Sequence, residues 1–369
     1  MKYLFHLGRN PELSSLEVVS FLQRTNRNYK ILKITKKFIL LEISSLDSIE
    51  TIKNLGGTTK ISSELNNLEE YIGKSIKAKK FNYAINILES SQASIKGLTD
   101  LIKKVSKQFK AKPLHKHVKE NEISPSKSQS LELELTLYKN NVYKVIAVSD
   151  PKSYKNRDEV RPFFDPLQVI SVRLAKILIN LAQPNKNTIL LDPFCGLGTI
   201  IQEASLLGIQ TIGSDNNLGM VKKCQSNITW AKKKLRLKVN PRIRNLNVRS
   251  LSKSLNGNFC IATEPYLGPY LKKLPWENEA REIARELSKI YEDFLREASK
   301  LLKQGSKVAL VVPTFKTRTN KIIRIGFQSM LEKYNFGIYQ PLNNTLIPID
   351  YIVRNNKIRR KIYVLEKLK

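Results

Sequence analysis

The feature that most constrains the fold is a glycine-rich turn at residues 191–199, which read Leu-Asp-Pro-Phe-Cys-Gly-Leu-Gly-Thr. The apolar run 187–191 before it is typical of a strand, and the apolar residues of 199–207 after it have helical spacing. Gly196 and Gly198 can take positive φ and let a ligand approach backbone N–H groups at a helix start. This unit predicts a nucleotide-like cofactor site in an α/β fold; the alternative is an ordinary turn with glycines for packing.

The residues after the turn narrow the choice of cofactor. A second short apolar run, 209–213, leads to Asp215, and an acidic residue about twenty positions after such a turn holds ribose hydroxyls. The dinucleotide fingerprint needs a third glycine where this chain has Ile201, which disfavours NAD. Residues 192–199 instead resemble the first motif of S-adenosylmethionine-dependent methyltransferases that act on amino groups of RNA and DNA. We therefore expect S-adenosylmethionine as the cofactor.

The charge of the chain predicts its partner. Its 369 residues, long enough for two or three domains, carry a formal net charge of +32. Such a charge indicates attraction to a polyanion through phosphate contacts and counterion release. Between Asp215 and Glu264 no acidic residue occurs, and we expect this stretch to track phosphates, with Lys232, Lys233 and Arg236 binding RNA. The alternative is a solvated basic surface. The basic residues there are Lys222, Lys223, Lys232, Lys233, Lys234, Arg236, Lys238, Arg242, Arg244, Arg249 and Lys253.

Other residue types exclude several classes of protein. The three cysteines have no paired spacing, which predicts a reducing compartment without disulfides. His6, His115 and His117 are too few and too scattered to predict a metal site. No apolar run approaches the ~20 residues of a membrane span, and the first residues lack the apolar core of a signal peptide. We expect a cytoplasmic protein with neither a metal nor a membrane association.

The first 150 residues predict two α/β units. In the first, Asn10 and Pro11 mark a helix start, and the order β-α-β-β-α-β is typical of a ferredoxin-like segment. Its other elements are expected at 3–7, 31–34, 38–43, 46–52 and 59–62. The second unit is expected to have a strand at 81–88, a helix at 97–109 and a hairpin of 131–138 with 142–149. The polar stretch 111–129 predicts a mobile loop.

Two further segments make a family resemblance specific. Residues 3–14 (YLFHLGRNPELS) and 154–164 (YKNRDEVRPFF) resemble the archaeal and eukaryotic tRNA guanosine-10 N2-methyltransferase family, and the similarity extends to 359–367. The resemblance implies a ferredoxin-like segment at 1–62, a THUMP domain at 63–150 that grips the acceptor stem of tRNA, and a Rossmann-like methyltransferase domain with a seven-stranded sheet at 151–369. Eukaryotic relatives use an activating protein subunit, and the oligomeric state is left open.

The resemblance also distributes roles over the turn and its surroundings. It implies a cofactor site made of Asp192, Phe194, Gly196, Gly198, Thr199, Asp215 and Asn247, in which Asn247 replaces an acidic residue near the adenine. Arg157 and Arg161 lie in a charged segment before a helix expected at 167–181, and we expect one of them to contact RNA or cofactor. The alternative is a linker in which Asp158 forms a salt bridge with one arginine.

The methyl-acceptor motif departs from the family pattern. After a buried strand at 259–262, the chain reads Thr-Glu-Pro-Tyr-Leu-Gly at 263–268, where the family has Asp-Pro-Pro-Tyr-Gly. An acidic group and a backbone carbonyl that accept both N–H bonds of an exocyclic amine direct its lone pair at the methyl group, and an aromatic ring stacks on the extruded base. Aligning the glycine puts Glu264 at the acidic position and Leu267 at the aromatic one. A shift by one residue puts Tyr266 at the aromatic position and Thr263 at the acidic one.

Glu264, Pro265 and Tyr266 are therefore the expected catalytic residues, with Tyr266 or Tyr270 as the stacking ring. Glu264 is a methylene longer than the family's Asp, and a displacement near ~1 Å can cost ~10²-fold in rate. Three hypotheses stay open: methylation of the usual guanosine, methylation of another RNA or DNA base, or RNA binding without catalysis. The alternative for Glu264 itself is that it only caps a turn. Trp230 and Trp276 are expected to pack, and the rest predicts a helix at 277–303 and strands at 307–312, 336–340 and 360–365.

Overall fold

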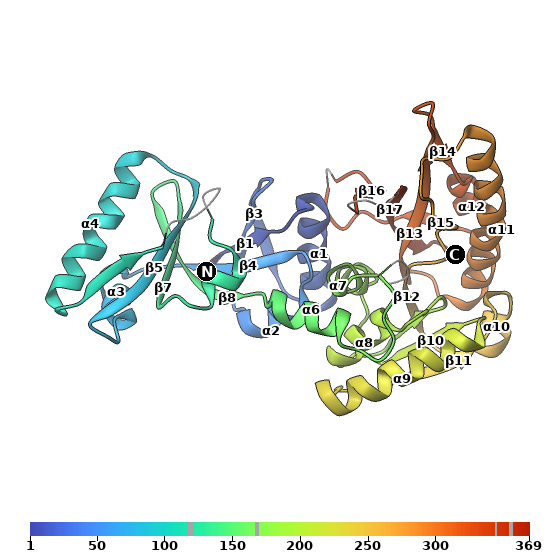
Figure 1. Ribbon diagram of the computed structural model, residues 1–369, viewed down its shortest axis with the longest axis horizontal. Coiled ribbons are helices and arrows are strands. Elements are labelled where there is room, and N and C mark those ends of the chain that lie inside the picture. The colour runs from blue at the N-terminus through green and yellow to red at the C-terminus, as the bar shows by residue number, and fades with distance from the viewer. Residues whose placement is uncertain (117–121, 167–169, 344, 354–356) are drawn as a thin grey trace. The chain divides into compact units, whose positions relative to one another are not determined.

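The computed structural model describes residues 1–116, 122–166, 170–343, 345–353 and 357–369. They divide into two compact units, one of residues 1–15 and 27–154 and the other of residues 16–26 and 155–369, each built around one sheet (Figure 1). The boundaries expected from the sequence at residues 62 and 150 stay a prediction. Within the described part of the chain, no helix has the length and apolarity needed to cross a membrane.

The first unit begins with the expected element order. Its elements are β1 (Lys2–Leu7), α1 (Pro11–Arg24), β2 (Tyr29–Ile34), β3 (Phe38–Ile43), α2 (Ser48–Asn54) and β4 (Thr58–Glu64). The residues of α1 from Leu16 onward group with the second unit. Asn10 caps α1 as expected, since its Oδ1 accepts the N–H of Leu13 at 3.2 Å. β2 and β3 form the expected antiparallel hairpin.

The remaining elements extend the same sheet, in the order β2-β3-β1-β4-β8-β7-β5-β6. They are α3 (Leu68–Ser75), β5 (Lys80–Glu89), α4 (Gln92–Gln108), β6 (Lys112–His115), α5 (Pro125–Ser128), β7 (Leu133–Tyr138) and β8 (Asn141–Val148). α3 and α4 contribute Ile72, Ile102 and Val105 to a core with the strand residues Phe81 and Leu135.

Two expectations for this region are wrong. The polar stretch 111–129 contains β6 and α5; β6 pairs with β5 at the edge of the sheet, where Pro113 is tolerated because an edge strand has unpaired N–H positions. Residues 117–121, including His117, lie outside the described residues. α4 begins at Gln92 and not at 97, because Ser91 caps it by accepting the N–H of Ser94.

The second unit is a doubly wound α/β domain. Its sheet has the order β11-β10-β9-β12-β13-β17-β15, with β14 beside β13 and β16 beside β17. The strands are β9 (Ile189–Asp192), β10 (Thr211–Asp215), β11 (Arg242–Asn245), β12 (Phe259–Thr263), β13 (Lys307–Lys316), β14 (Ile322–Arg324), β15 (Phe336–Ile338), β16 (Ile349–Tyr351) and β17 (Ile358–Lys367). The five neighbouring strands β11, β10, β9, β12 and β13 run parallel, and β17 pairs with β13 in the antiparallel direction, as in Rossmann-like methyltransferases.

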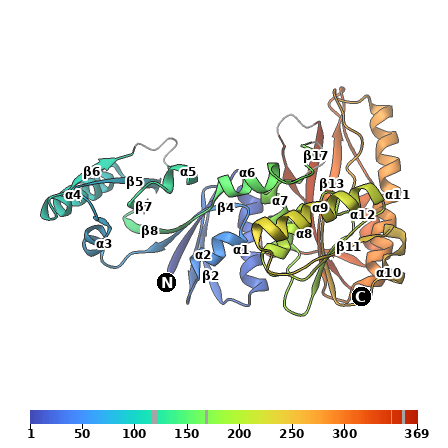
Figure 2. The ribbon, with the colours of Figure 1, turned by 60° about the horizontal axis from the view of Figure 1, so that its bottom comes forward.

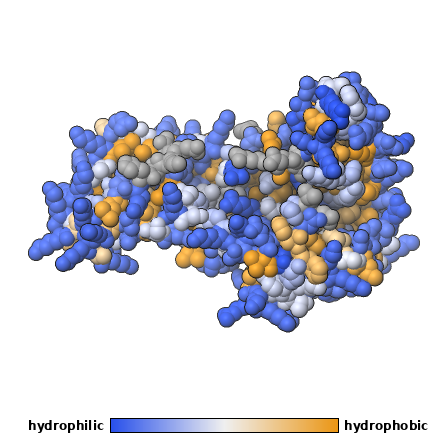
Figure 3. Space-filling view, viewed as in Figure 1, coloured by the Kyte–Doolittle hydropathy of each residue, from blue (hydrophilic) through white to orange (hydrophobic). Residues whose placement is uncertain are grey.

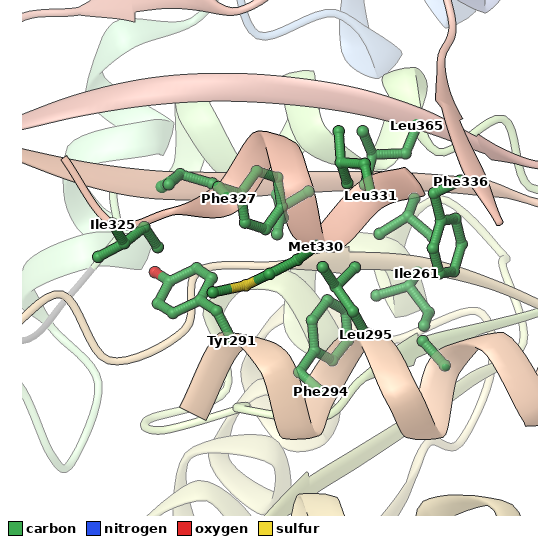
Figure 4. Packing of buried hydrophobic residues seen from close by; sticks show 14 of the residues in the cluster. Ile261, Tyr291, Phe294, Leu295, Ile325, Phe327, Met330, Leu331, Phe336 and Leu365 are labelled. Carbon is green, nitrogen blue, oxygen red and sulfur yellow. The ribbon is translucent and has the colours of Figure 1, made fainter. Parts of the chain in front are cut away.

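Helices cover both faces of this sheet. The helices are α6 (Pro151–Glu159, part of it in the first unit), α7 (Val172–Leu181), α8 (Thr199–Leu206), α9 (Leu218–Leu235), α10 (Leu251–Ser254), α11 (Glu277–Leu301) and α12 (Phe327–Lys333), with a 3₁₀ turn at Val248–Ser250. α8 and α9 lie on one side and α11 and α12 on the other (Figure 2). In the core beneath α11, Tyr291, Phe294 and Leu295 point toward Phe327 and Leu331 of α12 (Figure 4).

The segment before the glycine turn also differs from expectation. The alternative for this segment was a linker. Its first part is instead helical, since α6 includes Arg157. α7 begins at Val172 behind the cap Ser171, and residues 167–169 of the helix expected at 167–181 lie outside the described residues. Among the described residues, Asp158 forms no salt bridge with an arginine; it accepts the N–H of Val172 at 3.1 Å, while Arg157 pairs with Glu203.

Candidate active site

Three carboxylates lie at one edge of the second sheet because three neighbouring strands end there. Asp192 ends β9 and Asp215 ends β10, and Glu264 directly follows β12. β9 lies between β10 and β12, and all three run parallel, so their carboxyl ends are adjacent. Ligands of doubly wound sheets bind at this edge.

The glycine turn after β9 has the expected backbone. Gly196 and Gly198 have φ of +48° and +86°. A Cβ at Gly198 would lie 2.6 Å from the Sγ of Cys224, so this glycine permits close packing of the turn on α9. A Cβ at Gly196 would meet nothing closer than 3.9 Å, which leaves its backbone open to a ligand. Gly198 provides no side-chain cap, so the N–H groups at the start of α8 also suit a polar ligand.

Asp215 is held beside this turn. Its Oδ2 accepts the N–H of Gly196 at 3.1 Å and its Oδ1 accepts that of Asn217 at 2.9 Å. Asn245 fixes the loop from the neighbouring strand by donating from Nδ2 to the carbonyls of Asp215 (2.9 Å) and Asn216 (3.1 Å). Asn247 is exposed nearby, and its Oδ1 accepts the N–H of Arg249 at 3.0 Å.

Asp192 is buried between these groups. Its Oδ1 accepts a hydrogen bond from Thr263 Oγ1 at 2.7 Å and one from the N–H of Phe194 at 3.2 Å. Burial, with a smaller contribution from the charges of Asp215 and Glu264, raises the pKa of Asp192 to about 7, although these two hydrogen bonds act to lower it. The ring of Phe194 packs on the core, edge to face with Phe294. A carboxyl that titrates near neutrality beside other carboxylates suits a cationic ligand.

The segment from Thr263 to Gly268 directly follows the end of β12. Thr263 is fully buried and its hydroxyl donates to Asp192, whereas Glu264 lies where the chain leaves the sheet. Gly268 has φ of +107°, and a Cβ there would meet Ile283 of α11 at 3.2 Å, so the position favours glycine. Leu267, at the family's aromatic position, packs against the core.

Aromatic side chains remain available on the same loop. Tyr266 is 55% exposed and Tyr270 is 64% exposed, while Pro265 is buried. Trp276, the N-cap residue of α11, is 54% exposed, contrary to the expectation that it packs, and the guanidinium of Arg318 lies over its ring, 4.7 Å from the centroid. A ring with such exposure can stack on a base.

The two arginines before the turn are not on the surface. Arg157 donates from Nε and Nη2 to the two carboxylate oxygens of Glu203 at 2.8 and 2.9 Å. Arg161 is 4% exposed and donates from Nη1 to the Oγ1 of Thr199 at 2.8 Å, while its Nε and Nη2 have no partner in the described structure. Its buried guanidinium therefore lies at the start of α8.

The predicted basic face lies on α9. Lys232, Lys233 and Arg236 are exposed at its carboxyl end, and the helix has 18 residues, so they lie about 25 Å from its first turn beside Asp215. Hydrophilic side chains cover much of the molecular face in Figure 3. These cations suit contacts to a long polyanion and not to a ligand at the glycine turn.

Sequence reasoning missed three residues that shape the site. Asn227 of α9 donates to the carbonyls of Phe163 and Leu197 at 3.0 Å and accepts the N–H of Phe163 at 2.9 Å, which anchors the segment before α7 to the glycine turn. Asn245 holds the Asp215 loop. Arg360 of β17 donates from Nε to the Oε1 of Glu264 at 2.9 Å. No sequence signal indicates Arg360, since it is distant in the chain and lies in a closing strand.

The fold and the carboxylates at this edge of the sheet are those of a Rossmann-type methyltransferase domain. The model for an RMKL-like methyltransferase domain matches residues 159–335, and the model for a DNA methylase matches residues 18–235. The chain superposes on TrmN from Thermus thermophilus with a TM-score of 0.51 and 16% identity over 100% of both chains, a likeness in fold.

Curated relatives narrow the class. The tRNA (guanine(10)-N2)-dimethyltransferase of Methanothermobacter thermautotrophicus is 26% identical over 200 residues, covering 53% of this chain and 53% of the relative. The enzyme of that name from Methanocaldococcus jannaschii is 43% identical over 61 residues, covering 16% of this chain and 17% of the relative. The matched region thus spans about half, or less, of these relatives. The DNA methylase model covers more than half of the chain, which therefore belongs to that methyltransferase family. Over the matched regions the chain is similar to tRNA (guanine(10)-N2)-dimethyltransferases, and S-adenosylmethionine is the cofactor of this class of enzyme.

Proposed function

We propose that this chain transfers a methyl group from S-adenosylmethionine to the exocyclic N2 amine of a guanosine in tRNA. The observation that carries the proposal is the placement of Glu264 beside the glycine turn, on the same sheet edge as Asp192 and Asp215. The names of the curated relatives support the choice of tRNA and of guanosine.

S-Adenosylmethionine would supply an electrophilic methyl group and leave as S-adenosylhomocysteine, and the proton that the methylated amine gives up would pass to solvent. Asp215 would hold the ribose, and the turn from Phe194 to Thr199, with the open backbone of Gly196, would hold the rest of the cofactor. Asn247 would contact the adenine edge. The buried donors of Arg161 favour a role at the cofactor side over one at RNA.

Glu264 would accept an N–H bond of the amine and direct the nitrogen lone pair at the methyl carbon. The carbonyl of Pro265 would accept the second N–H, and Tyr266 would stack on the extruded base, since Leu267 faces the core. Because the ordered side chains are in place before the base arrives, orientation is the main contribution we assign to them.

The tRNA would lie across basic side chains. Lys232, Lys233 and Arg236 form an exposed basic end of α9, and Arg157, paired with Glu203, would act on RNA only through the segment it supports. We assign residues 63–150 to a THUMP-like role at the acceptor stem, in a cytoplasmic enzyme. An activating protein subunit, as in the eukaryotic relatives, is a further part of this proposal.

The test uses an unmodified tRNA transcript, labelled cofactor and the full chain. We expect wild type to methylate one guanosine, identified as N2-methylguanosine or its dimethyl form by nuclease digestion and mass spectrometry. Glu264→Gln should lower kcat about 10²- to 10³-fold with the affinity for cofactor retained. Glu286→Gln, which changes an exposed carboxylate on α11, is the matched control and should leave kcat unchanged.

Three outcomes would contradict the proposal. Undiminished transfer by Glu264→Gln would remove Glu264 from the mechanism. Tight tRNA binding with no transfer by wild type, alone or with cell extract as a source of a partner subunit, would leave a tRNA-binding protein. Efficient competition by duplex DNA at physiological salt would indicate a DNA substrate instead.

A further inference from the structure

Arg360 lies at the acceptor side of the site, on the strand that closes the sheet. It is opposite Pro313 of β13 and Tyr351 of β16, and its side chain is 10% exposed. Because β17 runs antiparallel to β13, the first residues of β17 lie beside the carboxyl ends of the parallel strands. Arg360 of β17 thus contacts Glu264, which directly follows β12.

The guanidinium of Arg360 is only partly satisfied. Its Nε donates to Glu264 Oε1 at 2.9 Å, and the Glu264 side chain is 13% exposed. Its Nη1 is buried and has no hydrogen-bond partner in the described parts of the chain. A buried donor without a partner is costly, and an arginine that pairs with a carboxylate usually engages it through two parallel bonds. The free donor therefore indicates a ligand.

The chemistry of this pair fits a nucleobase amine. In guanine, the N2 amine lies next to N3, a ring nitrogen that accepts a hydrogen bond. A carboxylate oxygen that accepts an amine N–H, with an N–H donor beside it, is complementary to that pair of atoms. A carboxylate alone provides only half of this pattern.

We propose that Arg360 positions Glu264 through Nε and binds the acceptor nucleobase through Nη1–H, at the ring nitrogen adjacent to the amine. The proposal rests on the proposed function, because it needs a base with an exocyclic amine in the site. It also explains how the longer Glu264 serves where the family has Asp: Arg360 fixes the carboxylate that the extra methylene would leave free to move.

The experiment compares Arg360→Met, Arg360→Lys and Arg359→Met with wild type. Arg359 is the matched control because it is the adjacent arginine of the same strand and is exposed. We measure kcat and KM for tRNA, the Kd of S-adenosylmethionine by calorimetry, and the melting temperature. The double variant Arg360→Met/Glu264→Gln, which leaves no unpaired charge, shows whether any unfolding of Arg360→Met comes from the orphaned carboxylate.

Arg360→Met should lower kcat about 10²-fold while the Kd of the cofactor changes less than twofold. Arg360→Lys keeps the positive charge but lacks the planar set of N–H donors of a guanidinium, and its kcat should be about tenfold higher than that of Arg360→Met. Arg359→Met should keep the wild-type kcat at saturating tRNA. Full kcat in Arg360→Met would overturn the proposal, and so would a loss of kcat that only follows a loss of folded protein or of cofactor binding.

A failure of the proposed function has a separate signature. If wild type transfers no methyl group, binding of guanosine in the presence of S-adenosylhomocysteine still tests Arg360. About tenfold weaker binding by Arg360→Met, with Arg359→Met unchanged, would support the assignment of Nη1 to the base. Equal binding by the three proteins would overturn it.

Discussion

The two halves of the proposed active site are built in different ways. The cofactor half is local: β9, the glycine turn and α8 are continuous, and Asp215 ends the next strand. The acceptor half joins Glu264 to Arg360 across 96 residues of sequence. Backbone geometry determines the first half, whereas a side-chain pair between distant strands determines the second. The acceptor half can therefore change its chemistry by side-chain substitution while the cofactor half stays the same.

The largest effect is expected from a methyl group placed in the cofactor half. Gly198→Ala combines a positive φ with a Cβ that would lie 2.6 Å from Cys224 Sγ. We expect a loss of about 3 kcal/mol in the free energy of unfolding, measured by denaturant titration. Gly97→Ala is the control: this residue of α4 has nothing within 4 Å of a built Cβ, and alanine there should stabilise by about 1 kcal/mol. If both variants have similar melting temperatures, close packing at Gly198 is not what makes glycine necessary there.

In the acceptor half, restoring the family residue should reduce activity. Glu264→Asp withdraws the carboxylate by about 1.5 Å from Arg360, so the pair is lost. We expect kcat to fall about 30-fold with the Kd of the cofactor unchanged. The control is Glu286→Asp. A Glu264→Asp variant with wild-type or higher kcat would show that Arg360 is not needed to place the carboxylate.

The cofactor half should also respond to pH. Asp192 has a pKa raised to about 7, chiefly by burial, and a cationic cofactor favours its ionised form. The affinity for S-adenosylmethionine should therefore rise as pH rises through 7 and fall up to about tenfold per unit below it. Asp192→Asn should remove most of this pH dependence of the affinity. Calorimetry between roughly pH 5.5 and 8.5, a range that includes the expected transition, measures it. If the affinity of Asp192→Asn keeps the same pH dependence, another titrating group causes it.

The same pKa has the opposite consequence for the protein without cofactor. The pKa of Asp192 in the folded chain lies above its ordinary value of 3.8. Its contribution to the free energy of unfolding is thus fully present below 3.8 and is lost as pH rises through about 7.

The smallest effect is expected on the loop that follows Glu264. Trp276→Ala should weaken tRNA binding about fivefold, as the loss of one base stack predicts, while Trp276→Phe should retain most of the affinity. Fluorescence anisotropy at fixed salt measures both. If both variants lose the same tRNA affinity, Trp276 contributes through its contact with the Arg318 guanidinium and not by stacking on a base.

The difference between the halves also decides what the sequence could predict. The glycine turn, Asp215 and the order of strands follow from local patterns: two glycines at positive φ, an acidic strand end and helical spacing. Arg360 could not be predicted, because only the antiparallel return of β17 brings it to β12. Position 158 shows a similar limit, since the alternative considered from the sequence was a salt bridge with an arginine, whereas in the fold Asp158 accepts the N–H of Val172.

The pairing of β17 with β13 has a consequence for synthesis of the protein. Glu264 is translated 96 residues before Arg360. At ribosomal rates of about 5–20 residues per second, roughly 5 to 20 seconds separate the two. During this interval the glycine turn is complete while Glu264 has no cation beside it. A nascent chain could therefore bind a methyl donor before Glu264 and Arg360 have met, so the proposed methyl transfer depends on a strand that is synthesised well after the glycine turn.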